Sequence, residues 1–97
     1  MIIRIVKLTL HPGMVNQFLE DFEQVKEQIR SFPGCLYTEM LMDTTSNGIL
    51  FTYSKWNSPE DLENYRQSDL FKATWGRVKP LFAEKAEAWT LDKQVDK

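Results

Sequence analysis

Apolar, largely β-branched side chains fill both alternating sets of positions in residues 2–10. Such a run is typical of a strand with both faces at least partly covered. His11-Pro12-Gly13 ends it, since proline lacks a backbone N–H and glycine favours turns. Apolar residues then recur every three or four positions, which predicts an amphipathic helix of about four turns. The apolar positions are Val15, Phe18, Leu19, Phe22, Val25 and Ile29.

A second group of elements follows the breaker Phe32-Pro33-Gly34. Residues 35–43 and 49–56 have the composition of strands, and Asn47-Gly48 lies in the short segment between them. Asn-Gly is a strong hairpin signal because both residues tolerate positive φ. We therefore expect two antiparallel strands joined by a turn at Asn47-Gly48.

The remaining elements are a broken helix and a final strand. Ser58-Pro59-Glu60-Asp61 begins a helix, with a hydroxyl N-cap, proline at the first helical position and acidic residues in the first turn. Ser68-Asp69 is a second N-cap after a short break, and Pro80 ends the segment. The last strand is expected over residues 84–91, and residues 92–97 form a polar tail.

The element order β-α-β-β-α-β predicts an α+β fold of the ferredoxin-like class, in a single domain over residues 1–97. Its four-stranded antiparallel sheet carries the helices on one face. The other face needs a cover, because the strands are apolar at both parities. The simplest cover is a second copy of the same sheet, so we expect a homodimer.

Composition excludes several classes of function. Twelve Lys and Arg against 14 Asp and Glu give a net charge of -2, which offers no electrostatic footprint for nucleic acid or an anionic membrane. No apolar run approaches the roughly 18 residues of a membrane helix and no leader pattern is found, so a cytoplasmic protein is expected. One Cys and one His leave no cluster for a metal.

The candidate chemistry is aromatic. Large rings gather in residues 53–78, and this grouping predicts one wall of a pocket for an apolar, aromatic ligand. Tyrosine hydroxyls can orient a phenol while the rings stack on it. The alternative is that these rings only pack at the edge of the core. The candidate substrate-binding residues are Tyr37, Tyr53, Trp56, Tyr65 and Trp75.

A catalytic base is harder to find. His11 is the single side chain with an ordinary pKa near neutrality, and its turn position favours a surface or capping role. Arg66 and Arg77 can stabilise an enolate or phenolate, although a solvated helix face is the simpler interpretation. No catalytic residue is assigned.

The order and spacing of several segments resemble the antibiotic biosynthesis monooxygenase family of the dimeric α/β-barrel superfamily. These segments are Pro12-Gly13, Gly34-Cys35-Leu36-Tyr37, the strand ending in Trp56, Ser58-Pro59-Glu60-Asp61-Leu62 and Ser68-Asp69-Leu70-Phe71-Lys72. The resemblance implies a barrel-like homodimer that oxidises quinols or polyketide phenols with O₂, without metal or flavin. Where a haem-degrading branch has its functional Asn, Trp and His, this chain carries Val6, Tyr65 and Trp75. Haem degradation is therefore disfavoured.

Three hypotheses follow for the function. The first is a cofactor-independent monooxygenase acting on a quinol or polyketide-like aromatic, and its main support is the resemblance. The second is a dimer that binds or senses a small ligand without chemistry, which agrees with the missing base. The third is a purely structural dimer whose pocket is collapsed.

Overall fold

The computed structural model describes residues 1–92. The strands are β1 (Ile2–Thr9), β2 (Cys35–Met42), β3 (Ile49–Trp56) and β4 (Glu87–Asp92). The helices are α1 (Val15–Arg30), α2 (Pro59–Arg66) and α3 (Asp69–Val78), with short 3-10 helices η1 (Pro12–Met14) and η2 (Lys79–Leu81). Every expected element is present. The last strand begins three residues later than predicted, and most of the predicted polar tail, residues 93–97, lies outside the described residues.

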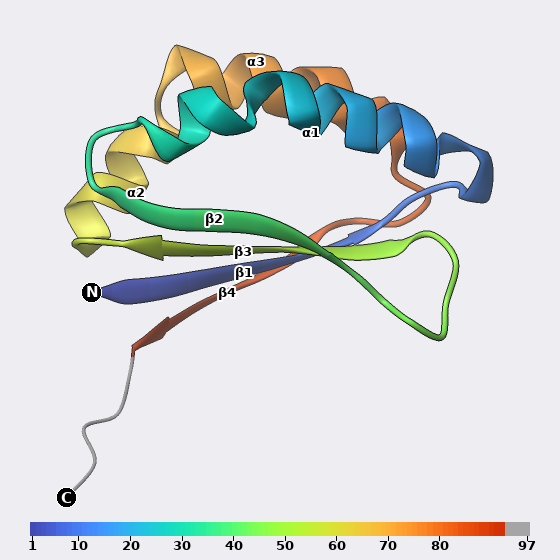
Figure 1. The fold of residues 1–97 in the computed structure, drawn as a ribbon, viewed down its shortest axis with the longest axis horizontal. Helices are drawn as coiled ribbons and strands as arrows, with labels where there is room; N and C mark the ends of the chain where they lie inside the picture. The colour runs from blue at the N-terminus through green and yellow to red at the C-terminus, as the bar shows by residue number, and fades with distance from the viewer. Residues whose placement is uncertain (93–97) are drawn as a thin grey trace, which may run out of the picture.

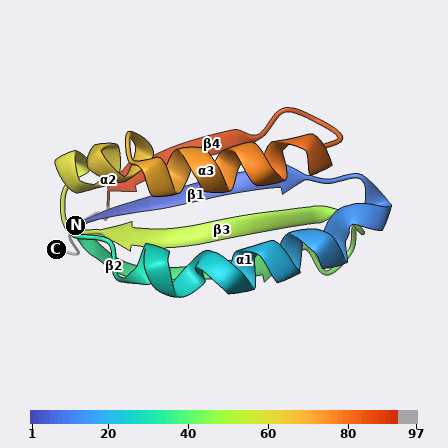
Figure 2. The same ribbon diagram turned by 90° about the horizontal axis from the view of Figure 1, so that it is seen from above.

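The strands form one antiparallel sheet in the order β2-β3-β1-β4. The helices lie over one face of that sheet (Figure 1). Seen from above, α1 runs over β2 and β3, while α3 runs beside it over β1 and β4 (Figure 2). This arrangement confirms the α+β ferredoxin-like prediction.

The starts of α2 and α3 follow the capping residues in the sequence. The Ser58 hydroxyl accepts a hydrogen bond from the Asp61 backbone N–H at 3.2 Å, and Pro59 is the first residue of α2. The Ser68 hydroxyl accepts from the Phe71 N–H at 3.1 Å at the start of α3. Each cap satisfies a donor that has no partner within its own helix. The two serines therefore fix where α2 and α3 begin.

β2 and β3 form the expected antiparallel hairpin, and Gly48 and Asp43 shape its connection. Gly48 has φ of +96°, whereas no non-glycine residue of the described chain has positive φ. Asp43 organises the loop before it, because its carboxylate accepts from the Thr45 N–H at 2.8 Å and the Thr45 hydroxyl at 2.9 Å. At Gly48 a Cβ would lie 2.8 Å from the Leu10 carbonyl oxygen, so this position requires glycine.

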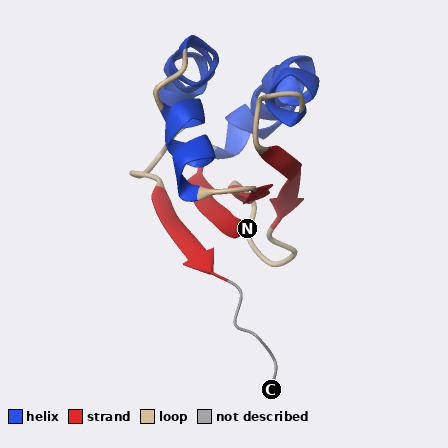
Figure 3. Ribbon diagram, turned by 90° about the vertical axis from the view of Figure 1, so that its left-hand side faces the viewer, coloured by secondary structure: helices blue, strands red, loops and turns tan. Residues whose placement is uncertain are grey.

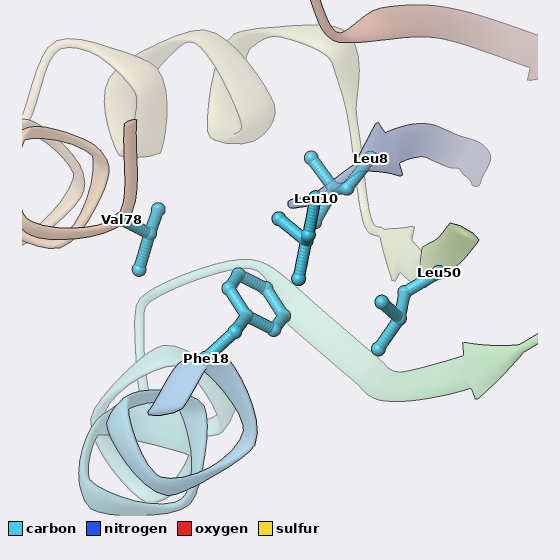
Figure 4. Packing of buried hydrophobic residues seen from close by; sticks show 5 residues of the cluster. All are labelled: Leu8, Leu10, Phe18, Leu50 and Val78. Carbon is cyan, nitrogen blue, oxygen red and sulfur yellow. The ribbon is translucent and has the colours of Figure 1, made fainter. Parts of the chain in front are cut away.

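The core between sheet and helices is divided into two clusters. One contains Leu8, Leu10, Phe18, Leu50 and Val78, near the η1 end of the molecule (Figure 4). The other contains Ile2, Trp56 and Leu62, near α2. The end-on view shows α1 and α3 standing apart above the sheet, with α2 nearer to the strands (Figure 3). Packing is therefore anchored at the two ends of β1.

The second face of the sheet carries no helix (Figure 1). Its apolar side chains are more exposed than core residues, at 43% for Tyr37, 43% for Leu41, 44% for Trp89 and 45% for Leu91. We call this side of the sheet the open face. Soluble monomers rarely expose a contiguous apolar patch of this kind.

Candidate functional site

A cavity of about 350 Å³ lies between the sheet and the helices. Small and hydroxyl-bearing residues form its floor at the middle of the strands, where large apolar side chains would otherwise fill the space. The two core clusters lie toward either end of β1, so the layer is hollow between them. The floor residues include Thr38, Thr52, Ser54 and Ala88 on the strands, and Ala86 just before β4.

Stacked rings from β3, α2 and α3 form a wall of this cavity. Trp56 and Tyr65 are stacked with centroids 4.9 Å apart, and Tyr65 meets Phe71 edge to face at 5.3 Å. Phe71 in turn stacks on Trp75 at 5.8 Å with planes 10° apart. All of these rings line the cavity. Such contacts hold each ring in place, so the wall has a defined shape.

Two members of the wall differ in what they can offer a ligand. Trp56 is 1% exposed, and its indole N–H donates to the Ser54 hydroxyl at 3.0 Å. Its donor is therefore already used. Burial raises the pKa of Tyr65 to about 12, so its hydroxyl stays protonated at neutral pH. Tyr65 can donate a hydrogen bond to a ligand but cannot serve as a base near pH 7.

Two arginines also line the cavity. Arg4 comes from β1, where its Nη1 donates to the Thr90 hydroxyl of β4 at 2.7 Å. Burial lowers the pKa of the Arg4 guanidinium and the neighbouring Arg66 charge lowers it further, while Glu63 raises it. Arg66 pairs with Glu63 at 3.1 Å on the surface of α2. Sequence reasoning missed Arg4, although it is a lone charge among apolar residues of the same strand parity.

The structure separates the predicted aromatic residues into two groups. Trp56, Tyr65 and Trp75 line the cavity, whereas Tyr37 and Tyr53 do not. Tyr37 and Tyr53 lie on the open face, where their rings meet edge to face at 6.2 Å. Tyr37 donates to the Glu39 carboxylate at 2.6 Å, and this bond raises the pKa of the tyrosine.

Strand geometry explains the separation. Tyr53 and Trp56 are three positions apart on one strand, so their side chains point to opposite faces. On β2 the register shifts between Cys35 and Tyr37, so Cys35 pairs with Trp56 and Tyr37 with Lys55. This bulge sends Cys35 and Tyr37 to opposite faces, although two-residue spacing would place them together. The structure therefore does not bring the five candidate residues together: three line the cavity and two lie on the open face.

No side chain in the described part of the cavity is a base at neutral pH. His11 is exposed, lies outside the cavity lining and makes no capping bond through its side chain. Arg77 is also exposed and outside the lining, as expected for a solvated helix face. Residues 1–92 contain no group of three or more His, Cys, Asp or Glu side chains placed to hold a metal ion.

The comparisons with known proteins identify the family. The model of the family described as antibiotic biosynthesis monooxygenase matches residues 1–76. The chain belongs to this family. No curated protein matches it.

Solved structures agree in fold. A protein of Caulobacter crescentus CB15, named provisionally as an antibiotic biosynthesis monooxygenase, superposes with a TM-score of 0.90 at 22% identity, over 97% of this chain and 90% of that chain. A conserved protein from Methanosarcina mazei Go1 gives a TM-score of 0.89 at 21% identity, over 96% and 93% of the two chains. At these identities the likeness shows the fold alone. Within residues 1–92 of the present chain, no helix is long and apolar enough to cross a bilayer.

Proposed function

We propose that the chain is a cofactor-independent monooxygenase that oxidises a quinol or polyketide-like phenol with O₂ in the cavity between sheet and helices. The observation that carries this proposal is the cavity itself, which has a volume of about 350 Å³ and a wall of stacked aromatic rings. Pockets for small molecules occupy roughly 300–1,000 Å³ and are mostly apolar with a few polar groups. Membership of the monooxygenase family gives the reaction class.

The chemistry needs no external reductant. A phenol that loses its proton becomes electron-rich enough to pass an electron to O₂, and the resulting pair combines at a ring carbon. That C–H carbon becomes a carbonyl, the phenol oxygen becomes the second carbonyl, and the other oxygen atom leaves as water. A phenol and O₂ thus give a quinone and water, with atoms and electrons balanced. The intermediates must be kept from water, and a mostly apolar lining favours this.

Oxygen uptake on a panel of quinols and polycyclic phenols tests this function. We expect consumption of O₂ above the uncatalysed rate, with one atom of labelled O₂ in the quinone and one in water. Uptake that stays at the uncatalysed rate for every compound contradicts the proposal. Heat-denatured protein is the control for adventitious metal.

A second candidate is a dimer that binds a small aromatic ligand without chemistry. It is favoured by the protonation state of Tyr65, whose pKa of about 12 leaves the described cavity without a general base. Thermal-shift screening with aromatic metabolites separates the two candidates, because a pure binding protein is stabilised by ligands that it never converts. The structural-dimer hypothesis required a collapsed pocket, and the cavity beside Tyr65 and Trp75 argues against it.

We also propose that the working form is a homodimer in which two open faces pack together. The support is the exposed apolar row on that face, with Trp89 and Leu91 on β4 and Tyr37 and Leu41 on β2. Sheet-on-sheet packing buries such rows at about 10 Å separation. Light scattering at micromolar concentration should give twice the monomer mass of 11.4 kDa, and a monomeric mass contradicts the dimer.

A further inference from the structure

Arg4 is out of place among its neighbours on β1. The side chains of one parity face the helices, and at the other positions of that parity they are apolar: Ile2, Val6, Leu8. Arginine is rarely taken out of water unless its charge is used. Arg4 nevertheless is partly buried and lines the cavity.

The charges around Arg4 do not neutralise it. On α2, Glu63 forms an ion pair with Arg66 and also receives a hydrogen bond from Gln67 at 2.9 Å. Glu63 raises the pKa of Arg4 but is paired with Arg66, whose own positive charge lowers the pKa of Arg4. The ion pairs within residues 1–92 leave Arg4 out: Lys7–Glu87, Lys26–Glu23, Arg30–Glu27 and Arg66–Glu63.

Arg4 also has donors to spare. A guanidinium carries five N–H donors, and the described residues accept from one of them, through the Thr90 hydroxyl at 2.7 Å. That bond directs the side chain along the sheet, from β1 toward β4. The remaining fork is the geometry that binds an anionic oxygen most strongly.

We propose that Arg4 selects the substrate as an aromatic anion: its guanidinium binds the deprotonated phenol oxygen while the ring packs against the aromatic wall of Tyr65 and Trp75. This inference rests on the proposed function and names its substrate form. The phenol proton is released to solvent, and the electron pair stays on the oxygen beside Arg4. The positive charge thereby does the work of a base, because it makes the anion the bound form.

A titration of bound 4-nitrophenol tests the inference, since its phenol and phenolate absorb at different wavelengths. The wild-type protein should bind the phenolate in preference, so that the bound probe titrates at lower pH than the free probe. In Arg4→Gln the affinity for the phenolate should fall by about tenfold or more, as expected for a lost charge-assisted hydrogen bond, with the neutral phenol little affected. Arg77→Gln is the matched control and should leave both affinities unchanged, because Arg77 lies outside the cavity lining.

Each outcome of these titrations either supports or overturns the role of Arg4. Wild-type protein that prefers the neutral phenol or ignores the probe overturns the inference, as does Arg4→Gln with unchanged phenolate affinity. Thermal unfolding of each variant checks that it is folded. If Arg4→Gln does not fold, Arg4→Lys decides in its place, because lysine keeps the charge but lacks the bidentate fork. Phenolate affinity at least threefold below wild type supports the inference, and unchanged affinity overturns it.

Oxygen uptake on the same variants distinguishes this inference from the proposed function. Phenolate binding that depends on Arg4, without uptake on any phenol, supports the inference and contradicts the oxygenase. Uptake that continues in Arg4→Gln with unchanged phenolate affinity supports the oxygenase and contradicts the role of Arg4.

Discussion

The two faces of the sheet differ, although the same four strands form both. Under the helices, the middle of the sheet carries small residues such as Thr52, Ser54 and Ala88, which leave room for a ligand. On the open face, neighbouring positions carry large rings, with Tyr53 beside Ile5 and Ile5 beside Trp89 in register. The difference teaches that strand alternation alone can place a cavity and an exposed apolar surface one residue apart.

The largest effect is expected from a charge placed on the open face, because this face is the proposed dimer interface. We expect Trp89→Glu to convert the proposed dimer into a monomer, because burying two symmetry-related carboxylates costs roughly 4–6 kcal/mol or more in total. Sedimentation or light scattering measures the change. Glu20→Lys, an exposed position on α1, is the control and should leave the mass unchanged. A Trp89→Glu protein that stays dimeric contradicts the role of the open face.

The covered face should show a pH dependence that originates in Tyr65. Its pKa is about 12 in the folded protein against an ordinary value near 10, so the unfolded state loses this proton first as the pH rises. The stability that Tyr65 contributes is fully present below pH 10 and is lost by about pH 12, a change of roughly 2–3 kcal/mol. Denaturant unfolding of wild type and Tyr65→Phe across this range measures it.

The expected result is a smaller alkaline loss of stability in Tyr65→Phe than in wild type. Phe71→Leu, which removes a neighbouring ring without a titrating group, is the control. It should lower stability at every pH and leave the slope unchanged. Identical slopes for wild type and Tyr65→Phe would show that Tyr65 is not protected by burial.

Filling the cavity tests the covered face of the sheet separately from the open face. Of the changes considered, it should affect the fold least. Thr52 on β3 lines the cavity. It lies between its register partners, Val6 on β1 and Met40 on β2. We expect Thr52→Phe to weaken binding of 4-nitrophenol about tenfold while stability changes by less than ~1.5 kcal/mol, because the new ring occupies empty space. The mass in solution should not change.

Thr44→Phe, the same substitution in the exposed loop before β3, is the control and should bind the probe as wild type does. Isothermal titration measures both variants. Undiminished binding by Thr52→Phe would mean that the ligand lies elsewhere.

Local patterns predict most of the fold but only part of the site. The serine caps at Ser58 and Ser68 act within four residues of chain, so sequence is sufficient to place them. The separation of Tyr53 from Trp56 could also be predicted from the sequence, because residues an odd number of positions apart on a strand point to opposite faces. The face on which Tyr37 lies could not be predicted from the sequence, since the bulge after Cys35 depends on how β2 pairs with β3.

Arg4 illustrates the other limit of sequence. Its position among apolar residues of β1 marks it as unusual, but a strand apolar at both parities does not reveal which face the helices cover. Its partner Thr90 lies 86 residues away along the chain. Only the assembled sheet brings the guanidinium to the same cavity as Tyr65 and Trp75.

The strand order also has a consequence for how this protein is made. β1 is the first strand to be synthesised, yet it lies in the interior of the sheet between β3 and β4. One edge of β1 stays unpaired until β4 has left the ribosome, and unpaired edges invite pairing with other chains. The strands that meet across this edge are the most distant in sequence, which slows folding. Synthesis of the cavity floor is therefore completed only with the last strand, so a nascent chain holds no finished site until its C-terminal strand has docked.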